Sequence, residues 1–185
     1  MKSLWKTLPA GLCLLPCLTA QAQSLNVTFS ANILETTCNM QLTGGTGDGS
    51  NNTYVIGDAN GKVGLDDILN KTDDAKVNFS LKATECPSSL SSIKTSINGT
   101  VSSYMDTVIV NSASSGGSSY VGIALARASA PDSFFKVNTS GALAWTSAEI
   151  NAGKVDLLAR IEATNSSKAT TGAFQADVTF NFTYE

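Results

Sequence analysis

The chain of 185 residues contains no histidine. Nucleophilic catalysis that relies on a Ser–His or Cys–His pair is therefore excluded, and so are zinc sites with imidazole ligands. The glycines between Gly44 and Gly49 lack the following Lys-Ser/Thr of a phosphate-binding loop, and we find no dinucleotide-binding motif. We accordingly expect no catalytic residues, no metal and no cofactor.

Positive charge is also scarce, with 12 Lys and Arg against 15 Asp and Glu and a net charge of −3. A chain so poor in cations does not neutralise phosphates, so nucleic acid is excluded as a partner, and no basic patch for anionic membranes exists. Beyond the first twenty residues no apolar run is long enough to span a bilayer, so we expect no membrane insertion.

The long apolar run of this sequence lies at the N-terminus, and this arrangement is typical of a signal peptide. Lys2 and Lys6 precede an apolar run over 8–18, and Ala20-Gln21-Ala22 forms a cleavage site, so residues 1–22 are expected to be removed. A lipid anchor on Cys13 or Cys17 is the weaker reading, because neither cysteine follows a small residue. The remaining chain, from Gln23, is predicted to be exported and to form one domain.

Only Cys38 and Cys86 remain after this cleavage. An even pair in an exported protein predicts a structural disulfide. A redox role would more often place the two cysteines two residues apart, which is not the case here.

Alternation of apolar and polar residues is the dominant pattern of what remains. Every even position from Phe174 to Tyr184 is apolar, and the stretch from Leu25 to Ile33 alternates in the same way near the mature N-terminus. Similar segments recur between turns, and the one over 155–163 is expected to point Asp156, Arg160 and Glu162 outward. About eight short strands predict an all-β, two-sheet antiparallel sandwich, with one helical turn over 65–69.

Two groups of residues suggest chemistry without establishing it. The pairs Asp66-Asp67 and Asp73-Asp74 could bind calcium or act as an acid/base couple, but a solvated loop is the preferred interpretation. Trp145 and Tyr104 could form a sugar-stacking patch, although such residues more often cap the core of a sandwich.

Several segments in order resemble the chaperone–usher pilin subunits of the type 1 fimbrial protein family. The resemblance runs from about Val27 to Glu185. It rests on five features: the strand from Val27 to Ile33 leading to Cys38; Phe79-Ser80-Leu81 leading to Cys86; Val121-Gly122-Ile123-Ala124-Leu125; Ala159-Arg160 followed by Ala163-Thr164; and Gly172 fourteenth from the end with Tyr184 penultimate.

This resemblance implies an immunoglobulin-like sandwich that lacks its last strand and is completed by a donor strand from another subunit. Residues 23–35 would be the donor segment and 36–185 the pilin domain. The donor side chains would be Leu25, Val27, Phe29, Ala31 and Ile33. The groove that receives a chaperone strand or a donor strand would be formed by Gly172, Phe174, Ala176, Val178, Phe180, Phe182, Tyr184 and Glu185.

The implied function is that of a structural fimbrial subunit, not an enzyme. Its implied partners are a periplasmic chaperone, an outer-membrane usher and neighbouring pilin subunits. Ala31 stands where the family commonly has glycine, and the short segment before Cys38 favours a minor or adaptor subunit. The alternatives are a major pilin and an adhesin that binds a host glycan or protein receptor, while a hydrolase built on Asp66 and Asp67 is the least favoured.

Overall fold

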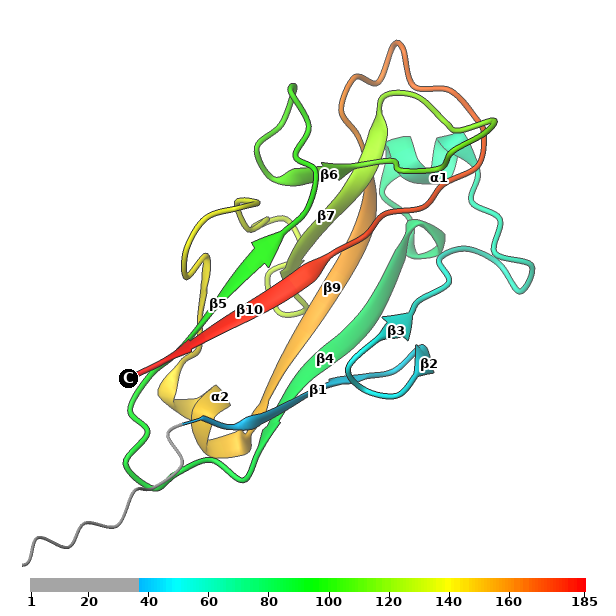
Figure 1. Ribbon diagram of the computed structural model, residues 1–185. Coiled ribbons are helices and arrows are strands. Elements are labelled where there is room, and N and C mark those ends of the chain that lie inside the picture. Colours follow the sequence, from blue (N-terminus) through cyan, green and yellow to red (C-terminus); the bar gives the residue numbers. More distant parts are fainter. Residues whose placement is uncertain (1–36) are drawn as a thin grey trace, which may run out of the picture. The chain divides into compact units, whose positions relative to one another are not determined.

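The computed structural model describes residues 37–185, which form mostly short strands (Figure 1). The helical elements are α1 (Leu65–Asn70), α2 (Ser147–Ala152) and the 3-10 turn η1 (Asp73–Ala75). The strands are β1 (Asn39–Thr43), β2 (Thr46–Gly47), β3 (Asn52–Thr53), β4 (Lys76–Thr84), β5 (Ile93–Asn98), β6 (Val108–Val110), β7 (Val121–Arg127), β8 (Leu143–Ala144), β9 (Lys154–Ala163) and β10 (Thr179–Tyr184).

Two antiparallel sheets enclose the core. The larger has the order β1-β4-β9-β7-β6 and the smaller the order β10-β5-β8, while β2 and β3 form a separate hairpin. β10 and β5 run side by side in Figure 1, with Thr179 opposite Asn98 and Tyr184 opposite Ile93. Buried side chains of both sheets form one cluster, so the predicted sandwich is confirmed.

Alternation places the core side chains as the sequence predicts. In β5, Ile93, Thr95 and Ile97 are buried and the residues between them are not. The hydroxyl of Thr95 is buried in this core but is not left without a partner, because it accepts a hydrogen bond from Nε1 of Trp145 at 3.0 Å. In β7, a side chain at Gly122 would collide with the backbone oxygen of Ile109, so the close pairing of β6 with β7 requires glycine there.

The prediction that Arg160 and Glu162 face water is wrong. Both are buried, with exposed fractions of 4% and 6%, and the loop after β7 packs against Arg160 through Asp132 and Phe134. Arg160 pairs with Glu162 at 2.5 Å and with Asp132 of that loop at 2.9 Å, and its guanidinium lies 4.8 Å from the ring centre of Phe134. Asp156 alone of the three is exposed, and the buried charges are accommodated because they are paired.

Helix α1 confirms the predicted helical turn, whereas α2 was not predicted. Thr146 caps α2 by accepting from the backbone N–H of Glu149, whose carboxylate accepts from the N–H of Thr146. Gly153 ends the helix with φ 60°, and Arg127 of β7 pairs with Glu149 at 2.8 Å. The signal was present as Thr146-Ser-Ala-Glu149 with glycine four residues later, the spacing of a capping box.

Cys38 and Cys86 form the predicted disulfide, with their Cα atoms 4.3 Å apart. Cys38 directly precedes β1 and Cys86 lies just beyond β4, whose residues pair with those of β1. The bond therefore closes the open end of this strand pair. No helix within residues 37–185 has the length and apolar character needed to cross a membrane.

Candidate functional site

An open cleft of about 1120 Å³ lies between the C-terminal segment and the chain that follows the β2–β3 hairpin. One wall is the segment 170–180, and the other is built from Tyr54, Ile56, Val63 and their neighbours. The floor consists of core side chains from three strands of the larger sheet, namely Val77, Phe79, Val121, Ile123, Leu125, Ala159 and Ile161. We call this cleft the groove.

The groove runs along the segment that leads into β10 and reaches the free edge of this strand at Thr179 and Phe180. β10 is the last strand in the order β10-β5-β8 and pairs only with β5, while β1 is the last strand of the larger sheet. Each of these strands therefore has one edge whose backbone N–H and C=O groups have no strand partner among the described residues. Such an edge is a template for another strand.

The apolar side chains of the C-terminal segment are incompletely covered. Every even residue from Phe174 to Tyr184 is half-buried and none is buried, whereas Ile93 and Ile97 of the adjacent β5 are each 1% exposed. Among the residues that line the groove, only Lys62 and Asp177 are charged, and Asp177 accepts a hydrogen bond from Ser112 at 3.1 Å. The groove thus suits an apolar occupant with polar backbone groups.

A row of aromatic rings crosses the groove. The ring of Phe79 on the floor lies 5.2 Å from that of Tyr54 and 6.0 Å from that of Phe180, so it bridges the two walls. The hydroxyl of Tyr54 donates to the backbone oxygen of Thr43 at 3.1 Å, and burial raises the pKa of Tyr54. The ring is therefore neutral near pH 7 and is held against the hairpin side of the groove.

The residues predicted for the groove divide into two sets. Gly172, Phe174, Ala176, Val178 and Phe180 line it, whereas Phe182, Tyr184 and Glu185 lie beyond it at the end of β10. Phe182 and Tyr184 pack against the core, and burial raises the pKa of Tyr184. The predicted donor residues Leu25, Val27, Phe29, Ala31 and Ile33 lie outside the described residues.

Glu185 is held by two residues that precede β5 and by Lys94 within β5. Its backbone oxygen accepts from the N–H groups of Ser91 and Ser92 at 2.8 and 2.9 Å, and its side chain pairs with Lys94 at 2.6 Å. These contacts fix the end of β10 against the smaller sheet. They are exposed to solvent, so the ion pair itself contributes little to stability.

Gly172 enters the groove wall at a point where no side chain fits. A Cβ atom there would lie 2.6 Å from both the backbone oxygen of Gly116 and the backbone nitrogen of Ser118, and φ is 153°. We predict that Gly172→Val costs about 1–3 kcal/mol of stability and lowers the yield of chaperone-bound subunit. The thermal midpoint and the amount of complex co-purified with the chaperone measure this.

Gly116→Val is the matched control for that substitution. Gly116 has φ 62° but its Cβ would meet no atom within 4 Å, so this variant carries backbone strain without a collision. A loss of complex in Gly172→Val that Gly116→Val does not share identifies the close approach as the cause. Equal yields of complex for Gly172→Val and the wild type would contradict the prediction.

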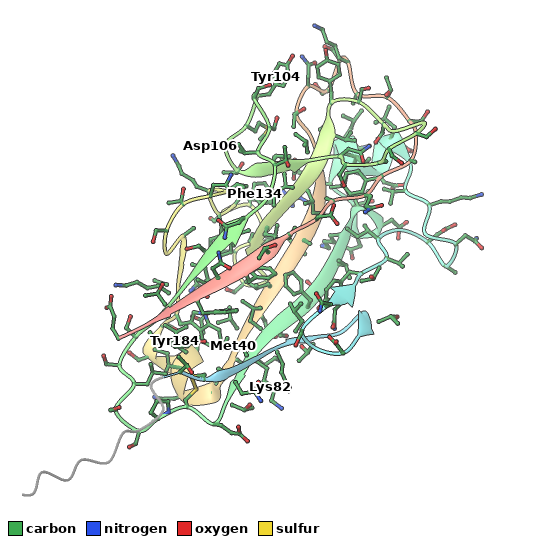
Figure 2. All side chains as sticks on the ribbon, in the orientation of Figure 1. Met40, Lys82, Tyr104, Asp106, Phe134 and Tyr184 are labelled. Atoms are coloured by element: carbon green, nitrogen blue, oxygen red, sulfur yellow. A yellow bond between two sulfur atoms is a disulfide. The ribbon has the colours of Figure 1, made fainter. Side chains whose placement is uncertain are left out.

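Two of the aspartates considered for calcium binding or acid/base chemistry make structural contacts within the chain. Asp67 accepts from the N–H of Gly64 and the hydroxyl of Thr72, and Asp73 pairs with Lys76. No group of three or more potential metal ligands occurs within the described part of the chain. Trp145 is buried in the core, as the favoured interpretation expects, so the alternative patch of Trp145 and Tyr104 does not form, and Tyr104 is 59% exposed. Figure 2 shows Tyr104 at the opposite end of the molecule from Tyr184.

The second wall and the floor of the groove escaped sequence analysis. Tyr54, Ile56 and Val63 lie in a turn-rich stretch, where three separated apolar residues carry no period that identifies a face. The sequence does not distinguish the floor residues from ordinary core residues, because they occupy alternate positions, as in any strand of a sandwich.

Comparison with known proteins agrees with this geometry. Residues 27–185 match a family described as fimbrial protein. The chain is 34% identical over 170 residues to an uncharacterized fimbrial-like protein of Escherichia coli (strain K12), YadM, covering 89% of this chain and 88% of that protein.

Two solved structures are similar in fold at 15% identity. The P pilus rod subunit PapA matches with a TM-score of 0.54, over 86% of this chain and 100% of that one. The second is a chaperone–usher pilus, whose structure is described as revealing the molecular basis of rod uncoiling. It matches with a TM-score of 0.52, over 90% of this chain and 99% of that one.

The fold and the groove define a class of protein, namely the immunoglobulin-like sandwich with a strand missing that builds chaperone–usher pili. The chain belongs to the fimbrial protein family, as the sequence resemblance predicted. It is a fimbrial subunit, and family and fold are those of structural proteins of surface pili.

Proposed function

We propose that this subunit polymerises by donor-strand exchange, in which an extended segment of the next subunit fills the groove. The observation that carries this proposal is the unpaired edge of β10 beside an open apolar floor. A strand added there would pair its backbone with the free edge and insert alternate side chains between the two walls. The occupant would complete both the sheet and the core.

Residues 23–35 of a second copy or of a related subunit are the proposed occupant. From Leu25 to Ile33 the apolar side chains alternate, and these nine residues would extend over about 26 Å. The groove wall from Gly172 to Phe180 also has nine residues and the same alternation. Because the donor lies at one end of a subunit and the groove accepts it from another, the polymer is open-ended and fibrous.

Before assembly the same groove needs a temporary occupant. Half-buried aromatic residues such as Phe174 and Phe180 would otherwise expose an apolar surface beside a free strand edge, which favours aggregation. We propose that a periplasmic chaperone covers the groove and that an outer-membrane usher exchanges it for the next subunit. The short segment from Gln23 to Thr37 supports a minor or adaptor position in the fibre.

The test of this function is removal of residues 23–33 from the exported chain. The proposal expects a chaperone-bound subunit that forms no SDS-resistant multimers. A chain that exports and folds as a soluble monomer with no chaperone would overturn it, because such a chain would be a complete sandwich.

A second candidate function is receptor binding on the side of the fibre, and Tyr104 is the observation that favours it. Tyr104 is the one exposed aromatic residue within 37–185. Its ring lies 5.5 Å from that of Tyr120, over which the ammonium of Lys168 lies at 5.7 Å. Exposed aromatic rings stack on the apolar faces of sugars, and the cation would favour an acidic saccharide.

Tyr104→Ala is expected to reduce binding of fimbriated cells to a glycan array at least about tenfold, since it removes the exposed stacking face. Leu69→Ala is the control, because Leu69 is also exposed and apolar but lies in α1. Binding that is unchanged in Tyr104→Ala, or wild-type fimbriae that bind no glycan, would eliminate this candidate.

A further inference from the structure

The groove wall continues beyond the end of the regular sheet. β10 pairs with β5 only from Thr179, because β5 ends at Asn98 opposite that residue. The preceding residues 172–178 have no strand ladder, yet they form most of the wall 170–180. Something other than a neighbouring strand must therefore hold them in an extended conformation.

The side-chain amide of Asn111, directly after β6, makes these contacts. Its Nδ2 lies 2.8 Å from the backbone oxygen of Ala173 and 2.9 Å from that of Ser118, and donates to both. Its Oδ1 accepts from the backbone N–H groups of Gln175 and Ala113 at 3.1 and 3.0 Å. Both donors and both acceptor sites of the amide are thus used.

These bonds select which edge of the segment faces the groove. In an extended chain the backbone groups of successive residues point to opposite edges. Ala173 also exchanges hydrogen bonds with Gly116 and Ser118, and the oxygen of Gln175 accepts from the N–H of Ser112 at 2.7 Å. The backbone groups of the odd-numbered residues Ala173 and Gln175 are therefore hydrogen-bonded to the loop between β6 and β7. Phe174 and Ala176 make no backbone hydrogen bond to another residue of 37–185.

We infer that Asn111 is a positioning residue for strand addition. It fastens Ala173 and Gln175 to the loop after β6, so that the backbone of Phe174 and Ala176 is presented to an incoming strand. Asn111 does not itself line the groove. This inference rests on the proposed function and extends it, because it gives one side-chain amide a part in orienting residues 172–178, beside the backbone hydrogen bonds with Gly116, Ser118 and Ser112.

Only an asparagine amide supplies this set of bonds. Aspartate has the same shape, but an oxygen would replace Nδ2 and face the carbonyl oxygens of Ala173 and Ser118. Alanine removes all of these bonds, including a further one from Nδ2 to the hydroxyl of Ser118 at 3.0 Å, without adding a charge. Asn138 offers a matched control, since its amide also bridges two backbone groups, the N–H and the oxygen of Gly99 at 3.2 and 3.0 Å, and it does not line the groove.

The experiment expresses the full chain with the chaperone and usher of its fimbrial system and follows SDS-resistant multimers with time. Asn111→Asp is expected to slow their formation about tenfold or more, with Asn111→Ala between it and the wild type. Asn138→Asp is expected to stay within about twofold of the wild type. Hydrogen exchange of the chaperone-bound subunit is measured in parallel, and the amide of Gln175 should exchange faster in Asn111→Ala, which removes the oxygen that accepts from it.

Unchanged exchange at Gln175 together with unchanged multimer formation would overturn the inference. An equal loss of multimers in Asn138→Asp would also overturn it, because the effect would then be one of general stability. Wild-type chain that forms no multimers would refute the proposed function, and the exchange at Gln175 would still decide whether Asn111 holds the segment. Asn111→Ala keeps the test informative if the aspartate variant fails to fold.

Discussion

Deletion of residues 23–33 is expected to abolish SDS-resistant multimers while leaving the chaperone-bound subunit intact. The described lining of the groove begins at Leu42, so the deletion removes the proposed donor without touching the acceptor. The chaperone complex should therefore form in near-normal amount. Gel analysis of unheated samples measures multimers, and co-purification with the chaperone measures the acceptor.

A matched variant separates the apolar pattern from the mere presence of the segment. Exchanging Thr28 for Ser and Ser30 for Thr keeps the length and the alternation, so multimers should persist. Replacing Val27 and Phe29 by Asp should reproduce the deletion, because each carboxylate would have to enter an apolar groove. Multimers that persist in the deletion variant would show that the donor lies elsewhere.

Loss of the disulfide has the second large expected effect. Cys38→Ser should prevent accumulation of folded subunit in the periplasm. The bond joins cysteines separated by 48 positions, and closing a loop of this size stabilises a domain by about 4 kcal/mol in the chain-entropy model. Because the whole stability of a small domain is about 5–15 kcal/mol, this is a large fraction of it.

The double variant Cys38→Ser, Cys86→Ser distinguishes lost stability from the side reactions of a free thiol. Both variants should yield little chaperone complex, since both lack the cross-link between the ends of β1 and β4. Recovery of the double variant alone would trace the loss to the unpaired Cys86. Near-wild-type amounts and thermal midpoints for both variants would contradict the assigned role of the bond.

Local patterns were sufficient to predict most strands. The alternation around Phe79 and Leu81, around Ile93 and Ile97, and around Leu157 and Ile161 predicted β4, β5 and β9, because side chains in a strand point alternately to its two faces. The disulfide could be predicted because only two cysteines remained after the signal peptide. The family resemblance then added the missing strand, which no periodicity could have revealed.

The extent of β10 was not predictable from its own residues. Alternation from Phe174 to Tyr184 is unbroken, yet the ladder begins only at Thr179, since a ladder requires a partner and β5 ends at Asn98. Asn111 escaped notice for a related reason. An asparagine after a short apolar run predicts a turn, and nothing in the sequence indicates that its amide reaches residues more than sixty positions away.

By itself the sequence determined the cysteine pair, the all-β class and the apolar faces of the strands, and it predicted export. Each of these depends on composition or on a short-range period. Only the tertiary structure decided that Arg160 and Glu162 are buried, that Tyr54 and Val63 form the second wall, and that the apolar side chains of 174–180 stay half-covered. Burial depends on what packs against a surface, and here that depends on segments far away in the chain and, in the proposed assembly, on a strand from another subunit.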